Sequence, residues 1–406
     1  MRRRLPYRVA AASAAVLAVS IALAPTTAGA TAMVGATAPG TAGPRPAVVE
    51  SADAGGASET AERLVSQMTT AQQASSVVMG HIPSIDTASL TAYMDSGLGG
   101  FILMGANIPA SEAELRAVTA ALTTDPARAP LVAIDQEGGI VSRLPWDEFP
   151  ASQTLKDRPA AETAAAFAAR ASLVARTGVN VNFGIVADTT ADSSSFIHGR
   201  SLGADPASAA ERVAAAVTAE EPFVASTIKH FPGHGAAPGD SHSLIPRTDK
   251  TLEEWRRTDA LPFIAGIDAG ASVLMFGHLD YAAVDAKPAS LSARWHEIAR
   301  DELGFEGVMV TDDLGMLQST GIAEYADPVA NAVAAIAAGN DLVLMIAHST
   351  PETADRLAAG IAAAVDDDAL AADRLQDAAE RVMTLRLERA ASGAVWALCA
   401  TCTPVP

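Results

Sequence analysis

The chain contains very few cysteines. Its 406 residues include only Cys399 and Cys402, which both follow the last predicted helix. In an exported protein this pair could form a small strained disulfide, and the spacing alone leaves that open. A zinc site built on a C-x2-C pair needs two further ligands, and none stands nearby in the sequence. We therefore place the pair outside the functional site.

Basic residues are also scarce. The chain has 28 Lys and Arg against 47 Asp and Glu, which gives a formal net charge of −19. This balance argues against nucleic acid as a partner, and we interpret it as a contribution to solubility rather than to fold.

The apolar run Val9–Ala24 is shorter than the roughly 20 residues that span a membrane. It follows Arg2, Arg3, Arg4 and Arg8 and precedes the small residues Ala28-Gly29-Ala30. This order is typical of a secretory signal peptide over residues 1–30. We expect a secreted or extracytoplasmic protein with no stable membrane insertion after cleavage. The export route and an association with the cell wall remain open.

Residues 31–57 are rich in Ala, Gly, Thr and Pro without apolar periodicity, which predicts a disordered linker. We assign residues 58–393 to one domain and 394–406 to a flexible tail. The length of the domain suits an α/β barrel.

Eight short apolar runs recur along this domain and predict strands. They are Val77–His81, Gly100–Met104, Leu131–Asp135, Val179–Val186, Ser226–His230, Ser272–His278, Val308–Thr311 and Asp341–Ile346. Helical patterns lie between most of them, at 111–123, 160–176, 207–219, 252–268 and 328–338. Runs buried on both faces that alternate with helices indicate a parallel sheet, and eight such units favour a closed (β/α)8 barrel of the TIM type. A doubly wound open sheet is the alternative, but no G-x-G-x-x-G follows the first strand to support a dinucleotide site.

Polar residues gather at the C-terminal ends of these runs. They are Asp135, Asp188, Lys229-His230, His278 with Asp280, and Asp312-Asp313. In a barrel these positions form one ring at the mouth, where active sites are built. In Asp312-Asp313 adjacent side chains point to opposite sides, so one can act as a nucleophile while the other caps the next helix or binds a neighbour. Both could instead be ordinary loop or helix-capping aspartates.

The densest cluster of titratable groups is Lys229-His-Phe-Pro-Gly-His-Gly235 followed by Asp240-Ser-His242. Its prolines and glycines exclude a regular helix and predict a shaped loop. Asp240 can bond one ring nitrogen of His242 and leave the other as a proton donor, although a lone Asp-x-His is more often a solvated loop pair.

A metal site is the competing interpretation of this cluster. Helical geometry for the pair His230 and His234 is excluded by the intervening proline and glycine, and Lys229 places a positive charge beside them. We predict neither a metal nor a cofactor. We interpret His81, His278 and His348 as structural.

Taken together, these motifs resemble glycoside hydrolase family 3, and within it the single-domain β-N-acetylglucosaminidases. The matching stretches are Gly97-Leu-Gly-Gly-Phe-Ile-Leu103, Ile134-Asp-Gln-Glu-Gly-Gly139, Gly199-Arg-Ser201, Lys229-His-Phe-Pro-Gly-His-Gly235, Asp240-Ser-His242 and Val310-Thr-Asp-Asp313. The resemblance implies a retaining mechanism with Asp312 as nucleophile and His242, oriented by Asp240, as acid/base. It also implies that the sugar is held by five residues, namely Asp135, Arg143, Arg200, Lys229 and His230. His234 would shape the loop. Ile140 departs from the family pattern, which commonly has arginine there, and we expect the loop to repack around it.

These expectations define the predicted function. We predict an exo-β-N-acetylglucosaminidase that acts as a monomer on β-linked terminal GlcNAc of peptidoglycan fragments or chitooligosaccharides. A phosphorylase or a β-glucosidase on the same scaffold is the near alternative. A wall-binding protein without activity and a metal-dependent hydrolase are the alternatives from other classes.

Overall fold

The computed structural model describes residues 54–392. Helix α1 (Ala54–Val65) begins inside the range that we assigned to the linker, four residues before the predicted domain boundary. The predicted signal peptide, most of the linker, the tail and the cysteine pair lie outside the described residues. No helix within residues 54–392 has both the length and the apolar character needed to cross a bilayer.

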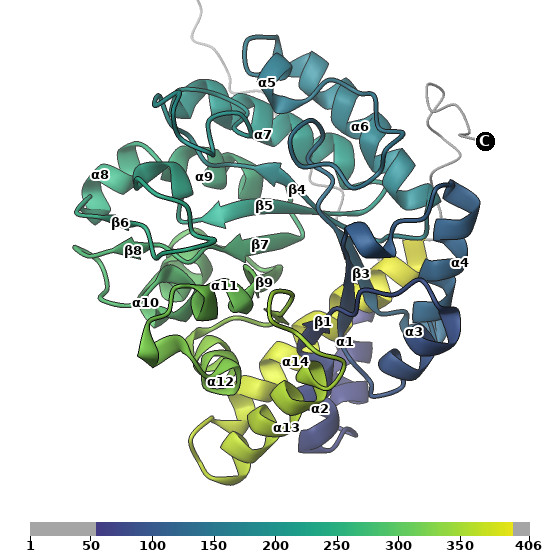
Figure 1. The fold of residues 1–406 in the computed structure, drawn as a ribbon. Coiled ribbons are helices and arrows are strands. Elements are labelled where there is room, and N and C mark those ends of the chain that lie inside the picture. The colour runs from purple at the N-terminus through teal and green to yellow at the C-terminus, as the bar shows by residue number, and fades with distance from the viewer. Residues whose placement is uncertain (1–53, 393–406) are drawn as a thin grey trace, which may run out of the picture. The chain divides into compact units, whose positions relative to one another are not determined.

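Eight parallel strands form the centre of the fold (Figure 1). They are β1 (Val78–Gly80), β2 (Gly100–Leu103), β3 (Leu131–Ile134), β4 (Val181–Val186), β5 (Ala225–Phe231), β7 (Val273–Phe276), β9 (Val308–Thr311) and β10 (Val343–Leu344). Each strand pairs with the next along the chain, and β1 pairs with β10 through Val78 and Val343. A parallel bridge between Val310 and Leu342 joins β9 to the segment of β10. The ring is therefore closed, which confirms the predicted barrel.

Most strands are apolar along their length because both of their faces are buried, although β4 and β5 also bury polar side chains such as Asn182 and Lys229. Within β2, Ile102 belongs to the cluster inside the ring, whereas Phe101 and Leu103 pack outward against helices. In β3, Ala133 points inward and Ile134 outward. This alternation follows from the two-residue repeat of a strand.

Helices surround the ring (Figure 1). The longer ones are α3 (Thr87–Met94), α4 (Glu112–Leu122), α6 (Ala160–Arg176), α7 (Pro206–Glu220), α9 (Ala260–Asp268), α12 (Pro328–Ala338), α13 (Thr353–Asp366) and α14 (Ala372–Ser392). Shorter ones are α2 (Thr70–Ser76), α5 (Ser152–Leu155), α8 (Leu252–Arg257), α10 (Ala293–Glu297) and α11 (Leu314–Ser319). Their starts follow from local chemistry. Ser111 and Glu114 form a capping box on α4, and Asp205 caps α7 ahead of Pro206.

Two predicted elements differ in the structure. The helix predicted at 252–268 is interrupted between Arg257 and Ala260, giving α8 and α9. Pro262 explains the break, because in an unbroken helix its ring would clash with the carbonyl group of Thr258, whereas the first turn of a new helix tolerates it.

The strand predicted at 341–346 shortens to Val343–Leu344. Its two ends have other partners. The Asp341 carboxylate pairs with Arg300 and Arg374, and the backbone N–H of Ile346 donates to Asp313. A two-stranded parallel ladder that we did not predict joins β6 (Arg247–Thr248) to β8 (Asp280–Tyr281).

Candidate active site

A cavity of about 320 Å³ lies at the C-terminal ends of the strands. Seven of the eight predicted site residues line it, namely Asp135, Arg143, Arg200, Lys229, His230, His242 and Asp312. Asp240 is the exception and contacts the cavity only through His242. The chain therefore brings together residues that are up to 177 positions apart (Asp135 to Asp312) because the parallel strands all end at one face.

The floor of the cavity is a network of ion pairs. Oδ1 of Asp135 lies 3.0 Å from Nζ of Lys229, and its Oδ2 lies 3.1 Å from Nη2 of Arg143. Burial alone would raise the pKa of the Asp135 carboxyl, but Lys229 and Arg143 outweigh burial and lower it to about 2. The carboxylate is thus ionised at any physiological pH.

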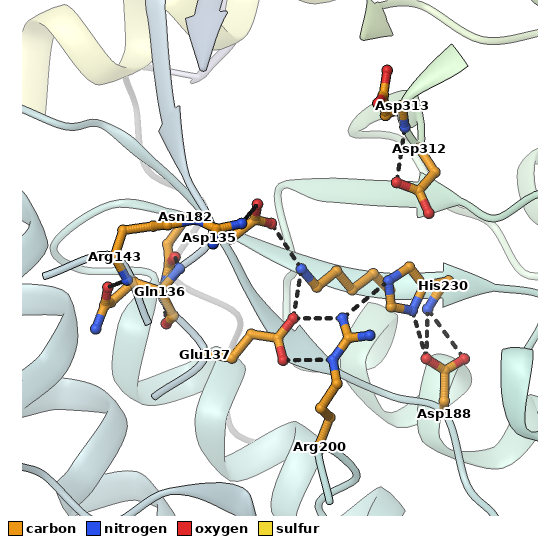
Figure 2. A network of polar contacts seen from close by, with 11 residues as sticks. Asp135, Gln136, Glu137, Arg143, Asn182, Asp188, Arg200, His230, Asp312 and Asp313 are labelled. Carbon is orange, nitrogen blue, oxygen red and sulfur yellow. Dashed lines mark hydrogen bonds and ion pairs between the residues drawn. The ribbon is translucent and has the colours of Figure 1, made fainter. Parts of the chain in front are cut away.

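Glu137 extends this network, and we had given it no role from the sequence. Its Oε1 lies 2.8 Å from Nζ of Lys229 and 2.7 Å from Nη2 of Arg200, and its Oε2 accepts a bond of 2.9 Å from Nε of Arg200. Figure 2 shows these contacts continuing from Asp135 through Lys229 to Glu137, and from there through Arg200 to His230. The side chain of Lys229 is only 3% exposed, so its charge depends on both carboxylates.

His230 is held by Asp188, a strand-end residue that we had noted without assigning it a role. The Nδ1 atom of His230 lies 2.6 Å from Oδ2 of Asp188, whose two oxygens also accept the backbone N–H of His230. Burial opposes the charge on Asp188, yet His230 and His234 keep the pKa of this carboxyl below its usual value. A proton on Nδ1 leaves Nε2 of His230 as the atom that faces Arg200, 3.4 Å from its Nη2.

Asp312 and Asp313 divide their roles. The backbone N–H of Asp312 donates to Phe276, and its Oδ1 accepts the backbone N–H of Asp313, while the side chain lines the cavity. Burial would raise the pKa of Asp312, but His230, His278, the Asp313 N–H and Lys229 together lower it. In Figure 2 the Asp312 side chain stands apart from the ion-pair network, and the bond drawn to it comes from the Asp313 N–H.

Asp313 has a structural task instead. It accepts backbone N–H groups from Gly315, Ile346 and Ala347, so it caps α11 and ties β9 to the segment after β10. Burial raises its pKa to about 6. Adjacent residues of a strand point to opposite sides, and this predicts the different roles of Asp312 and Asp313.

The Asp240–His242 pair forms as its spacing predicts. Nδ1 of His242 lies 2.6 Å from Oδ1 of Asp240, and the backbone N–H of His242 donates to the same oxygen at 3.1 Å. The side chains are 65% and 51% exposed, for His242 and Asp240 respectively, so the free Nε2 can reach a ligand in the cavity or water. Phe196 lies beside this pair, with its ring centroid 6.3 Å from that of His242. Sequence reasoning gave Phe196 no role.

Two further histidines, His278 and His234, lie close to the site and are buried; His234 also lines the cavity. His278 is buried, with Nδ1 2.7 Å from Ser290 Oγ and Nε2 2.9 Å from the carbonyl oxygen of Asp313. His234 is buried against the edge of Phe196, and burial lowers its pKa to about 4. Within residues 54–392, no group of three or more His, Cys, Asp or Glu side chains is arranged to hold a metal ion.

Comparisons with known proteins find relatives over most of the described chain. Residues 65–385 match the family model described as the glycosyl hydrolase family 3 N terminal domain. A β-hexosaminidase of Pseudomonas aeruginosa is 38% identical over 256 residues, which cover 61% of this chain and 75% of the relative. A family 3 β-N-acetylglucosaminidase from Paenibacillus superposes with a TM-score of 0.75 at 29% identity, covering 84% of this chain and 66% of that one. A β-N-acetylhexosaminidase from Beutenbergia cavernae gives a TM-score of 0.69 at 28% identity, covering 79% and 99%.

Proposed function

The chain belongs to glycosyl hydrolase family 3 and is a glycoside hydrolase, and from this premise we propose that it is a retaining exo-β-N-acetylglucosaminidase. The observation that carries the proposal is the placement of an ionised Asp312 and of His242, held by Asp240, in the lining of one cavity whose floor is a polar network. The substrates proposed are β-linked terminal GlcNAc residues of peptidoglycan fragments or chitooligosaccharides. We propose export as well, since residues 1–30 have the order of basic, apolar and small residues that is typical of a secretory signal peptide.

In the first step, the Asp312 carboxylate attacks the anomeric carbon. A new C–O bond to Asp312 forms as the bond from that carbon to the glycosidic oxygen breaks. The electron pair stays with the leaving oxygen, which takes a proton from Nε2 of His242. Before this step, Asp240 stabilises the charged ring because its Oδ1 accepts a hydrogen bond from Nδ1 of His242, with 2.6 Å between the two atoms.

In the second step, His242 acts as the base. Its neutral Nε2 takes a proton from water, whose oxygen attacks the anomeric carbon and releases Asp312. Two inversions at this carbon leave the product with the β configuration of the substrate. The sugar itself is held by the network of Asp135, Lys229 and Arg200, whose fixed charges need little reorganisation during the reaction.

Hydrolysis is favoured over phosphorolysis by the charge balance of the cavity. Its lining includes three lysine or arginine side chains, and each is paired with a carboxylate, Arg143 with Asp135, Arg200 with Glu137 and Lys229 with both. A phosphate ion would need positive charge that these pairs already neutralise. Neutral water meets no such barrier.

The decisive assay compares 4-methylumbelliferyl β-GlcNAc with the matching β-glucoside, each with and without phosphate. We expect turnover of the GlcNAc substrate alone, no effect of phosphate, and a β-anomer as the first product in a proton NMR time course. Asp312→Ala should reduce kcat at least a thousandfold, while Asp95→Ala, at an exposed position on the outside of the domain, should not change it. Unchanged turnover in Asp312→Ala would remove this residue as nucleophile, and an inactive wild type would favour a wall-binding protein.

A further inference from the structure

Ile140 occupies an unusual position for an apolar side chain. Immediately after β3, the chain forms a tight hairpin in which Gly138 and Val141 make an antiparallel bridge and the Glu137 N–H donates to Val141. Gly138 and Gly139 make the reversal with φ values of 83° and 70°, which favour glycine. Ile140 lies at the tip and is 66% exposed. The loop has therefore not repacked around it, contrary to our expectation from the sequence.

The hairpin forms part of the rim of the active-site cavity. Glu137 and Val141, on its two arms, both line the cavity. The tip reaches across to the next loop, because Cδ1 of Ile140 lies 2.6 Å from the position that a Cβ atom on Gly199 would occupy. Gly199 immediately precedes Arg200, which belongs to the polar floor. Ile140 is thus an exposed apolar group at the tip of a rim hairpin and next to the loop that carries Arg200, although it does not itself line the cavity.

The position of the proton donor indicates which part of the rim a leaving group would contact. The group that receives a proton from His242 must lie beside that ring, and hence beside Phe196, 6.3 Å away between centroids. Phe196 also lies under the guanidinium of Arg200, at 5.9 Å, next to the segment that Ile140 contacts. Phe196 lines the cavity on the side where the leaving group departs, and Ile140 contacts Gly199 in the loop that carries Phe196.

We propose that Ile140 is a specificity-determining residue that contacts an apolar face of the leaving group. This inference rests on the proposed function, since it takes the sugar pocket and the proton donor from it. The ligand class is a β-GlcNAc glycoside whose leaving group carries apolar surface close to the glycosidic oxygen. An aryl group and a sugar with a lactyl ether share this chemistry. An unmodified sugar, with hydroxyl groups around its ring, offers less apolar surface to cover the isoleucine.

The experiment measures kcat/KM for wild type, Ile140→Ser and the matched control Ile85→Ser. Ile85 is also an exposed isoleucine, at 53%, and belongs to a different loop, between β1 and α3. The substrates are 4-methylumbelliferyl β-GlcNAc, the GlcNAc-β-1,4-MurNAc disaccharide, which carries a lactyl ether, and chitobiose, which does not. Competitive inhibition by free GlcNAc reports on the sugar pocket in each variant.

For Ile140→Ser we expect kcat/KM to fall about fivefold on the aryl substrate, less than twofold on chitobiose, and the inhibition constant of GlcNAc to stay unchanged. Fivefold corresponds to about 1 kcal/mol, the effect of covering roughly 40 Å² of apolar surface. If kcat/KM of Ile140→Ser also falls on the MurNAc disaccharide, the lactyl ether is a second apolar group that Ile140 contacts. If kcat/KM does not fall on this substrate, the contact is restricted to aryl groups.

Equal losses on the aryl substrate and chitobiose, or no loss on either, would overturn the proposal. So would a wild-type dimer in analytical ultracentrifugation that Ile140→Ser abolishes, because Ile140 would then serve self-association. Failure of the proposed function looks different, since wild type would then neither turn over any β-GlcNAc substrate nor be inhibited by GlcNAc.

Discussion

Asp135→Asn tests whether the paired charges beneath the cavity stabilise the folded protein. Lys229 and Arg143 lower the pKa of Asp135 from 3.8 to about 2, and its side chain is only 16% exposed. A difference of roughly 1.8 pKa units corresponds to about 2.5 kcal/mol of folding free energy at pH 7. The asparagine removes the charge, keeps the shape and should lose that amount. For a domain of roughly 340 residues, this loss lowers Tm by about 3 to 4 °C.

The pH dependence separates this cause from a packing defect. Because the folded-state pKa is depressed, the stabilisation is complete above pH 4, the range of the unfolded carboxyl, and disappears as pH falls through 2. The difference in unfolding free energy between wild type and Asp135→Asn should therefore shrink to about half at pH 3. Urea unfolding followed by circular dichroism at pH 7, 4 and 3 measures it, with Asp95→Asn as an exposed control. A difference below 1 kcal/mol at pH 7, or one that does not change with pH, would refute the reasoning.

Two other buried carboxylates give predictions of opposite kinds. Glu220 is fully buried, and burial raises its pKa to about 8 against the opposing effects of Asn182 and Arg170. Because the folded-state pKa is raised, the stability that protonated Glu220 contributes is present below pH 4.5 and is lost as pH rises through 8. The free energy of unfolding of Glu220→Gln, measured with urea and relative to wild type, should therefore rise by about 3 kcal/mol between pH 5 and pH 8. A gain independent of pH would contradict this cause. Asp188→Asn should lower kcat/KM on 4-methylumbelliferyl β-GlcNAc at least tenfold and weaken inhibition by GlcNAc, because His230 loses the charged partner that fixes its tautomer. Normal inhibition by GlcNAc would show that His230 does not need Asp188 for binding.

The barrel could be predicted from the sequence because its strands carry a strong signal. Runs such as Leu131–Ile134 are apolar at every position, and only burial on both faces explains this. Strand ends were harder to place. The last strand is shorter than its apolar run because Asp341 and Ile346 bind groups that are distant in sequence. The helix break before Pro262 was missed for a similar reason. It depends on where α9 begins, and the apolar periodicity of a long segment averages over such a break.

The site was predicted in part, for a related reason. Local motifs placed Asp240 next to His242 and separated the tasks of Asp312 and Asp313, since each pair is close in sequence. Glu137 escaped notice because its partner Arg200 is 63 positions away, and a pairing of this kind depends on the closed ring. Within the motif Ile134-Asp-Gln-Glu, an acid that follows a strand by three residues was the available signal.

The ion pairs at the floor of the cavity also affect which substrates the cavity can accept. Lys229 contacts two carboxylates, Asp135 at 3.0 Å and Glu137 at 2.8 Å, and each of these carboxylates also holds an arginine. An incoming anion would have to displace a buried carboxylate from a cation, at a cost of several kcal/mol. A sugar hydroxyl can instead donate to a carboxylate oxygen that is already paired, because such an oxygen retains a free lone pair. Under the proposed function, the network would therefore select a neutral sugar ring by charge, and the choice among leaving groups would fall to the rim.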